Sequence, residues 1–104
     1  RFNMISYNVS VTIDAEIETT WVHWMKTSHI PDVMNTGCFV KYDFYKLIKP
    51  EGEEGITFII QYKALHMDDY ESYKEKYAAE LQKQTIDRFR DKFVAFRTLM
   101  VEVM

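Results

Sequence analysis

Residues 5–13 alternate between two kinds of side chain, and this alternation restricts the possible folds more than any other feature of the sequence. The odd positions are apolar: Ile5, Tyr7, Val9, Val11 and Ile13. The even positions are small, polar and uncharged: Ser6, Asn8, Ser10 and Thr12. A period of two predicts a strand with one buried face. Since strand faces in contact with water usually carry Lys or Glu, the uncharged polar set indicates that this face is covered as well.

A first helix is predicted to follow this strand. Asp14 fits an N-cap, and apolar residues then recur every three or four positions to about Ser28. Pro31 is expected to interrupt the pattern, because proline cannot donate a backbone hydrogen bond within a helix. Residues 32–36 can form another short turn, and Gly37 supplies the left-handed conformation that ends it.

Three further strands and a second helix complete the pattern. Residues 38–48, 56–64 and 93–103 are rich in aromatic and branched side chains, which favour strands. Between the last two, Asp68 and Glu71 have the spacing of a capping box and predict the start of a helix. The buried stripe of this helix is expected to comprise Tyr70, Tyr73, Tyr77 and Leu81.

The resulting order β-α-β-β-α-β is that of an α+β, ferredoxin-like domain. Because crossovers between parallel strands are right-handed, both helices are expected on one face of a single antiparallel sheet with the strand order 4-1-3-2. A single domain over residues 4–104 is expected, since 104 residues are too few for two. We expect residues 1–3, which precede Met4, to be a remnant of recombinant expression.

The sheet face without helices predicts a homodimer. Both alternate sets of residues 93–103 are mostly apolar, so neither orientation of the last strand presents a polar face to water. Residues 38–48 share this property. Because soluble monomers rarely expose large apolar patches, we expect an identical chain to cover this face.

Composition argues against several classes of partner and location. The net charge of −3 at pH 7 does not suit nucleic acid, whose phosphates require a basic surface. The longest apolar run, residues 93–96, is far shorter than a membrane span, and no signal peptide is recognisable. The single cysteine, Cys38, cannot form an internal disulfide, so we expect a reducing, cytoplasmic location.

Three stretches resemble a family of small bacterial proteins known only as a domain of unknown function. They are YNV at residues 7–9, the pattern WxxWMxxxHIPxVxxTGCF at residues 21–39, and DKFVAFRT at residues 91–98. That family is similar in turn to the dimeric α/β-barrel superfamily, in which two ferredoxin-like sheets face each other. Members of the superfamily include cofactor-independent monooxygenases and isomerases. The resemblance implies a dimer and transfers no catalytic residue.

His29 is the candidate catalytic residue. It lies where the first helix is expected to stop before Pro31, and helix ends near a sheet edge often open onto a cleft. An imidazole at such a place can act as a general base near neutral pH, or ligate a metal or haem iron. The alternative is that His29 caps the last carbonyl groups of the helix and takes no part in chemistry.

Four further residues are candidate ligand contacts: Asn8, Gln61, Arg97 and Trp24. If the last strand turns Arg97 toward the barrel, it converges with Asn8 and Gln61 on one sheet face, where its guanidinium would attract a carboxylate or an enolate. The alternative is a polar network at the dimer interface. Trp24 would add an aromatic wall, although its spacing also fits a buried stripe.

No motif in the sequence identifies a reaction. No two histidines have the i, i+4 spacing of a helical metal site, and no phosphate-binding loop, dinucleotide fingerprint, nucleophile elbow or CxxC pair occurs. We therefore expect neither a metal nor a cofactor.

Three functions stay open. The first is binding of a small apolar or carboxylate-bearing molecule between sheet and helices. The second is a cofactor-independent monooxygenase or isomerase with His29 as the base. The third is a protein-interaction scaffold that uses the acidic residues 51–54. A cavity of about 300 Å³ or more with His29 and Arg97 pointing into it would discriminate between them.

Overall fold

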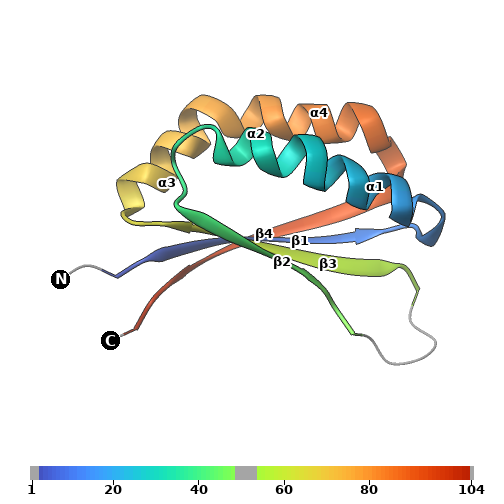
Figure 1. Ribbon diagram of the computed structural model, residues 1–104, viewed down its shortest axis with the longest axis horizontal. Helices are drawn as coiled ribbons and strands as arrows, with labels where there is room; N and C mark the ends of the chain where they lie inside the picture. The colour runs from blue at the N-terminus through green and yellow to red at the C-terminus, as the bar shows by residue number, and fades with distance from the viewer. Residues whose placement is uncertain (1–2, 49–53, 104) are drawn as a thin grey trace.

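The computed structural model describes residues 3–48 and 54–103, and it confirms the ferredoxin-like α+β arrangement. Figure 1 shows the helices in one layer above a twisted sheet. In their order across the sheet, the strands are β2 (Lys41–Lys46), β3 (Ile56–Ala64), β1 (Ile5–Ile13) and β4 (Phe93–Val101). All neighbouring pairs are antiparallel, and the predicted order 4-1-3-2 is confirmed. Most of the acidic segment predicted to act as a scaffold, residues 51–53, lies outside the described residues.

The first helix continues further than the sequence predicts. It consists of a 3₁₀ turn (Ala15–Ile17), α1 (Glu18–Trp24), a π-helical turn (Met25–His29) and α2 (Ile30–Met34). The prediction that Pro31 interrupts this helix is wrong. In the π-helical turn the Ile30 N–H donates to the Met25 carbonyl, and Pro31 then occupies the first turn of α2, a position that proline tolerates. Asp14 precedes the helix as predicted, but its side chain accepts no capping hydrogen bond.

The second helix also contains a π-helical turn. It consists of α3 (Met67–Tyr73), the π-helical turn (Lys74–Ala78) and α4 (Ala79–Phe89). His66 holds the N-cap position, so the prediction of Asp68 as the cap is wrong. Because the π-helical turn shifts the helical phase, Ala78 is buried while Tyr77 is exposed, and the predicted stripe is wrong at Tyr77. No helix in the described part of the chain has the length and hydropathy needed to cross a membrane.

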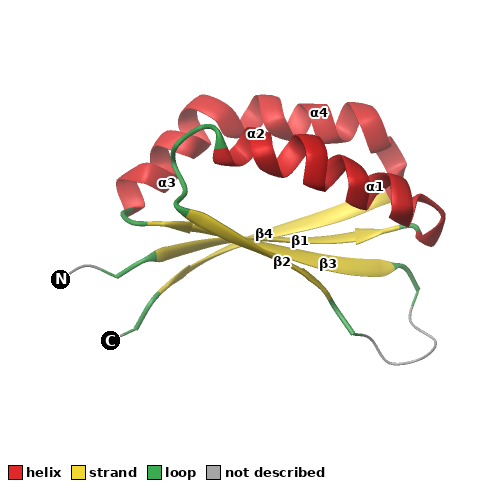
Figure 2. Cartoon of the chain, in the orientation of Figure 1, coloured by secondary structure: helices red, strands yellow, loops and turns green. Residues whose placement is uncertain are grey.

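The strand register decides which side chains meet the helices. Val9 of β1 lies opposite Ile60 of β3 and Arg97 of β4, so these three residues share the helix-covered face. The helices lie over this face alone (Figure 2), and the opposite side is called the helix-free face below. The largest fully buried side chains of the core are Trp21, Tyr62, Ile13, Ile30, Ile60 and Val33. Burial of each such side chain stabilises the fold by roughly 1.5–3 kcal/mol.

The helix-free face combines a polar centre with an apolar edge. In the centre, Ser6 Oγ donates to Asn8 Oδ1 at 2.7 Å, and the hydroxyl groups of Thr12 and Thr57 are hydrogen-bonded at 2.7 Å. The edge strand β4 adds exposed apolar side chains: Val94, Phe96 and Met100. The last strand therefore presents an apolar surface on this face, as the sequence predicts.

Candidate ligand-binding site

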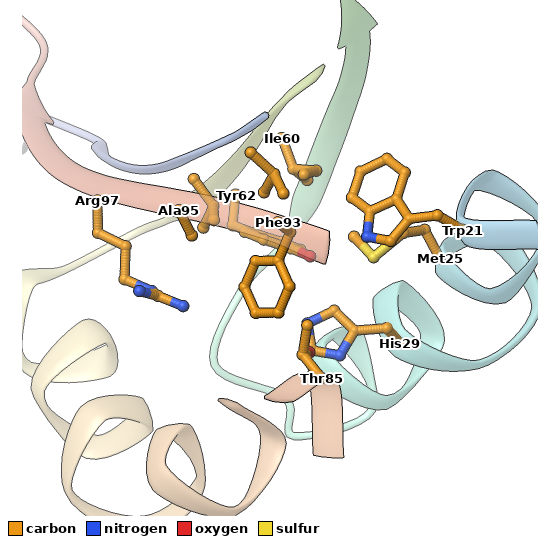
Figure 3. Close-up of a pocket in the computed structure, with 11 residues that line it drawn as sticks. Trp21, Met25, His29, Ile60, Tyr62, Thr85, Phe93, Ala95 and Arg97 are labelled. Atoms are coloured by element: carbon orange, nitrogen blue, oxygen red, sulfur yellow. The ribbon is translucent and has the colours of Figure 1, made fainter. Parts of the chain in front are cut away.

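A cavity lies between the sheet and the helices, beside the first π-helical turn (Figure 3). Its walls are mainly apolar and include Val9, Val11, Met25, Ile60, Phe93 and Ala95. The polar groups come from Trp21, His29, Thr85 and Arg97, with Tyr62 beside them. The enclosed volume is about 30 Å³, which holds one or two groups of the size of water. His29 and Arg97 both line the cavity, but its volume is far below the roughly 300 Å³ that would have favoured an enzyme or a binding protein for a whole small molecule.

The first helix brings three cavity residues onto one side. Trp21, Met25 and His29 are spaced four residues apart, and residues at this spacing are neighbours on a helix surface. The π-helical turn spans Met25 to His29, and such turns are frequent at functional sites. Trp21 is predicted from the sequence as a core residue, and its place in the wall of the cavity was not predicted. Its four-residue spacing to His29 through Met25 was the available signal.

His29 lies inside the continuous helix, so the alternative that it caps the helix end is wrong. Its ring stacks on Trp24, with ring centroids 5.0 Å apart. Burial lowers the pKa of His29 to about 4, against the opposing charge of Asp32 and with a further lowering by Arg97. The imidazole is therefore neutral at pH 7. Its Nδ1 atom is buried and has no hydrogen-bond partner among the described residues.

Trp21 carries a second buried nitrogen without a partner. The residue is 1% exposed, and its ring packs against Phe58 with centroids 4.9 Å apart. Its Nε1 atom has no acceptor in the described part of the chain. Buried donors without an acceptor are rare, because each costs desolvation energy without return. The unpartnered nitrogens of Trp21 and His29 thus belong to two residues of the same cavity.

Arg97 lies at the end of the cavity opposite Trp21 and His29. Figure 3 shows it beyond Ala95 and Phe93 as seen from Trp21 and His29. Burial raises the pKa of Tyr7, and the charge of Arg97 together with its hydrogen bond to the Tyr7 side chain opposes this shift. Among the ion pairs between described residues, none involves Arg97. Arg97 is an exposed residue, so an anion from outside the chain can approach it.

The predicted convergence of Asn8, Gln61 and Arg97 does not occur. Asn8 lies opposite Gln61 and Thr98 on the helix-free face, and Arg97 is on the other side of the sheet. The reason is the alternation of side chains along β4, which turns Thr98 toward Asn8 and Arg97 away from it. Asn8 accepts from Ser6 Oγ, and its Nδ2 lies 3.4 Å from Thr98 Oγ1. Asn8 thus belongs to a polar network on the helix-free face, while Arg97, which the alternative placed in that network, lies on the other face.

Trp24 packs against His29 and is not among the residues that line the cavity. Its ring packs between His29 and Phe89, whose ring centroid is 5.2 Å away, and the Arg88 guanidinium lies 5.9 Å from its centroid. Trp24 therefore fixes the plane of the His29 ring and takes no direct place in the cavity.

The cavity combines mainly apolar walls with the guanidinium of Arg97, which can hold an anion. Across residues 3–48 and 54–103, no three His, Cys, Asp or Glu side chains gather closely enough to hold a metal ion.

These features define a ferredoxin-like α+β domain with a small site between sheet and helices. Residues 4–103 match the family described as Domain of unknown function (DUF4286), and the chain belongs to this family. Among curated proteins, no sequence matches the chain.

Several solved structures share the fold along nearly the whole chain. A dimeric ferredoxin-like protein from an uncultured marine organism is 11% identical, with a TM-score of 0.67 and coverage of 100% of this chain and 98% of that one. SnoaB, a cofactor-independent oxygenase from Streptomyces nogalater, is 8% identical, with a TM-score of 0.61 and coverage of 98% and 95%. A hydroxynitrile lyase from Passiflora edulis is 12% identical, with a TM-score of 0.69 and coverage of 100% and 99%. At such low identity the likeness establishes the fold alone.

Proposed function

We propose that this protein binds a small, largely apolar molecule with a carboxylate in the cavity, and that Arg97 holds the carboxylate. One observation carries the proposal: Arg97, which forms no ion pair within the described residues, lines a cavity whose other walls are mainly apolar. A guanidinium beside apolar side chains suits a molecule that joins a carboxylate to an apolar body.

The small enclosed volume limits how much of the ligand is engulfed. About 30 Å³ admits only the tip of a molecule. The rest would lie at the Arg97 end, where Arg97, Leu99 and Val101 are exposed on the helix-covered face of β4. The exposed apolar side chains there suit an apolar body beside the guanidinium.

Calorimetric titration with phenylacetate tests this function, because the probe joins one carboxylate to one ring. Arg97→Gln is expected to weaken binding at least about tenfold, the usual scale for a hydrogen bond to a charged group. Lys63→Gln serves as the matched control, since it removes the same charge from the helix-free face. Absence of binding to the unmodified protein, or an equal loss in both variants, would contradict the proposal.

We further propose that two copies of the chain pair through the helix-free face. The exposed Val94, Phe96 and Met100 support this, because a stable interface buries about 800 Å² per partner and needs an apolar centre. The solved structure of the marine protein, described as dimeric, supports it further. Analytical ultracentrifugation is expected to show a particle of two chains. A single 12.5 kDa particle at every concentration would contradict the proposal.

A second candidate function is a cofactor-independent oxygenase or isomerase in which His29 removes a proton. It is favoured by the neutral imidazole beside the cavity and by the fold shared with SnoaB. With a pKa of about 4 the base is weak in the empty cavity, and a bound anion would raise that pKa. Deuterium exchange at the methylene group of phenylpyruvate, which lies next to its ketone, tests this candidate in D₂O with NMR detection. Exchange no faster than without protein, or unchanged by His29→Gln, would exclude His29 as the base.

A further inference from the structure

Arg97 has few neighbours that could hold its long side chain in one position. The residue is exposed, and no ion pair between described residues includes it. Val9, which lies directly opposite on β1, has no hydrogen-bonding group in its side chain. Fixing a long side chain that is otherwise mobile weakens binding by about two- to tenfold. A guanidinium that is already held in its binding position avoids this loss.

Tyr7 is the residue of β1 whose side chain reaches the Arg97 guanidinium. Since Tyr7 pairs with Leu99 and Val9 pairs with Arg97, Tyr7 is a diagonal neighbour of Arg97 on the helix-covered face. Diagonal neighbours lie about 7–8 Å apart, which is within the reach of aromatic and long side chains. The Arg97 guanidinium donates a hydrogen bond to the Tyr7 hydroxyl oxygen, and the side chain of Gln82 on α4 is bonded to the same hydroxyl group.

The Tyr7 ring is itself held by other rings. The residue is 4% exposed, and the ring centroids of Tyr70 and Tyr73 lie 5.2 Å and 5.7 Å from its own. The rings of Phe39 and Tyr62 are stacked on it, each with a centroid distance of 6.0 Å. Aromatic rings at such distances pack favourably. The Tyr7 hydroxyl group is therefore a fixed point beside a side chain that would otherwise be mobile.

The charge of Arg97 acts on residues from several elements that pack over or within the sheet. Burial shifts the pKa values of Tyr7, Tyr73 and His29, and the charge of Arg97 adds a smaller effect to each. These residues belong to β1, α3 and the first π-helical turn. The guanidinium is thus directed into the space between sheet and helices, and Figure 3 shows the Arg97 side chain leaving β4 on the side of the helices.

We propose that Tyr7 is a positioning residue for the anion site: its hydroxyl group, fixed by the surrounding rings, holds the Arg97 guanidinium in place for the carboxylate of the ligand. A guanidinium has several N–H groups, so the bond to Tyr7 leaves donors for both oxygens of a carboxylate. Tyr7 is not among the residues that line the cavity, and it acts through Arg97. This inference rests on the proposed function and adds a supporting residue to its site.

Tyr7→Phe tests the inference, because it keeps the ring and removes only the hydroxyl group. Phenylacetate should bind about fivefold more weakly to this variant in calorimetric titration. A second readout is the motion of the Arg97 side chain, measured by NMR relaxation of its Nε–H group, whose signal is identified by its loss in Arg97→Gln. In the absence of ligand, this group should be immobile in the unmodified protein and mobile in Tyr7→Phe. A tyrosine that only filled the core would not change this motion.

Two internal references accompany these measurements. Tyr73→Phe is the matched control, since Tyr73 is buried against the Tyr7 ring and Arg97 acts on it through charge alone. This variant should keep the affinity for phenylacetate and the immobile Arg97. Arg90 provides the reference for a mobile arginine, because it is exposed and has no ion pair among the described residues.

The outcomes separate this inference from the proposed function. An affinity unchanged by Tyr7→Phe, or an equal loss in Tyr73→Phe, would overturn the role of Tyr7 and leave carboxylate binding at Arg97 intact. An Arg97 side chain as mobile as that of Arg90 in the unmodified protein would also overturn it, whether or not Tyr7→Phe folds. Failure of the unmodified protein to bind phenylacetate would overturn the proposed function, while the motion of Arg97 would still show whether Tyr7 holds it.

Discussion

Ile60 and Tyr62, on the helix-covered face of the sheet, are at most 2% exposed, whereas Phe96 on the helix-free face is 68% exposed. The two helices of the chain cover the helix-covered face. No described residue covers the helix-free face. The alternation of side chains along a strand therefore indicates that a sheet face is covered. It does not indicate whether the same chain or a second chain covers that face.

The two faces also differ in how their polar groups are satisfied. On the helix-free face, Ser6 pairs with Asn8, and Thr12 pairs with Thr57. On the helix-covered face, Arg97 forms no ion pair within the described residues and lines a mainly apolar cavity. A self-satisfied polar centre suits an interface between copies, whereas a cation beside an apolar cavity suits an anionic ligand.

The largest expected effect would come from truncating a phenylalanine on the helix-covered face. Phe58 is buried against Trp21, so Phe58→Ala should lower the free energy of unfolding by about 3–5 kcal/mol. Phe96→Ala, measured by the same urea denaturation at a protein concentration where single chains predominate, should change it by about 0.5 kcal/mol or less. Similar losses of unfolding free energy in Phe58→Ala and Phe96→Ala would show that side chains on the two faces are equally buried within one chain.

The burial of His29 predicts a pH dependence. Its pKa of about 4 in the folded protein lies below the ordinary value of 6.5. The unfolded chain therefore takes up this proton first as the pH falls, and the free energy of unfolding should drop by about 3 kcal/mol between pH 6.5 and 4. His29→Gln should remove this part of the pH dependence, measured by urea denaturation across the range. Parallel curves for the two proteins would mean that His29 is not buried.

Charging the helix-free face should break the homodimer. Phe96→Asp places a carboxylate in the proposed interface, and the dissociation constant measured by ultracentrifugation should rise about thirtyfold, equivalent to roughly 2 kcal/mol. Ile86→Asp is the control, because Ile86 is 53% exposed on α4, away from this face. A dimer that survives Phe96→Asp but dissociates with Ile86→Asp would place the interface on the helices.

The smallest effect is expected where α4 passes into β4. Arg90 has φ 41° and ψ −113°, a conformation that costs strain in any residue with a side chain. Arg90→Gly should raise the free energy of unfolding by about 1 kcal/mol in thermal or urea denaturation. Dimer formation and phenylacetate binding should stay unchanged, since the residue belongs to neither face. A loss of stability would show that the side chain contributes more than the strain costs.

The sequence predicts most of the fold because alternation and turn residues act locally. The strand predicted at residues 56–64 has these bounds in the structure, and the strand at residues 5–13 does too. The π-helical turns were not predictable in this way, since neither alternation nor a turn residue marks them in the sequence. They explain why the predicted break at Pro31 and the predicted burial of Tyr77 are both wrong.

The site was less predictable than the fold. Both alternate sets of β4 are apolar, so only the pairing of Val9 with Arg97 determines that Arg97 faces the helices. His29 was identified as a candidate, but its expected place at a helix end was wrong. Trp21 resembles any core tryptophan in the sequence, and its unpartnered nitrogen is visible only in three dimensions.

Chemical-shift mapping of a phenylacetate titration tests most directly whether the helix-covered face binds the ligand. The backbone amide signals of Thr85 and Ala95 are predicted to shift together along one binding curve. Asn8, Gln61 and Thr98 on the helix-free face should keep their positions. Shifts confined to these last three residues would contradict the account, because they would place the ligand on the face assigned here to the second copy.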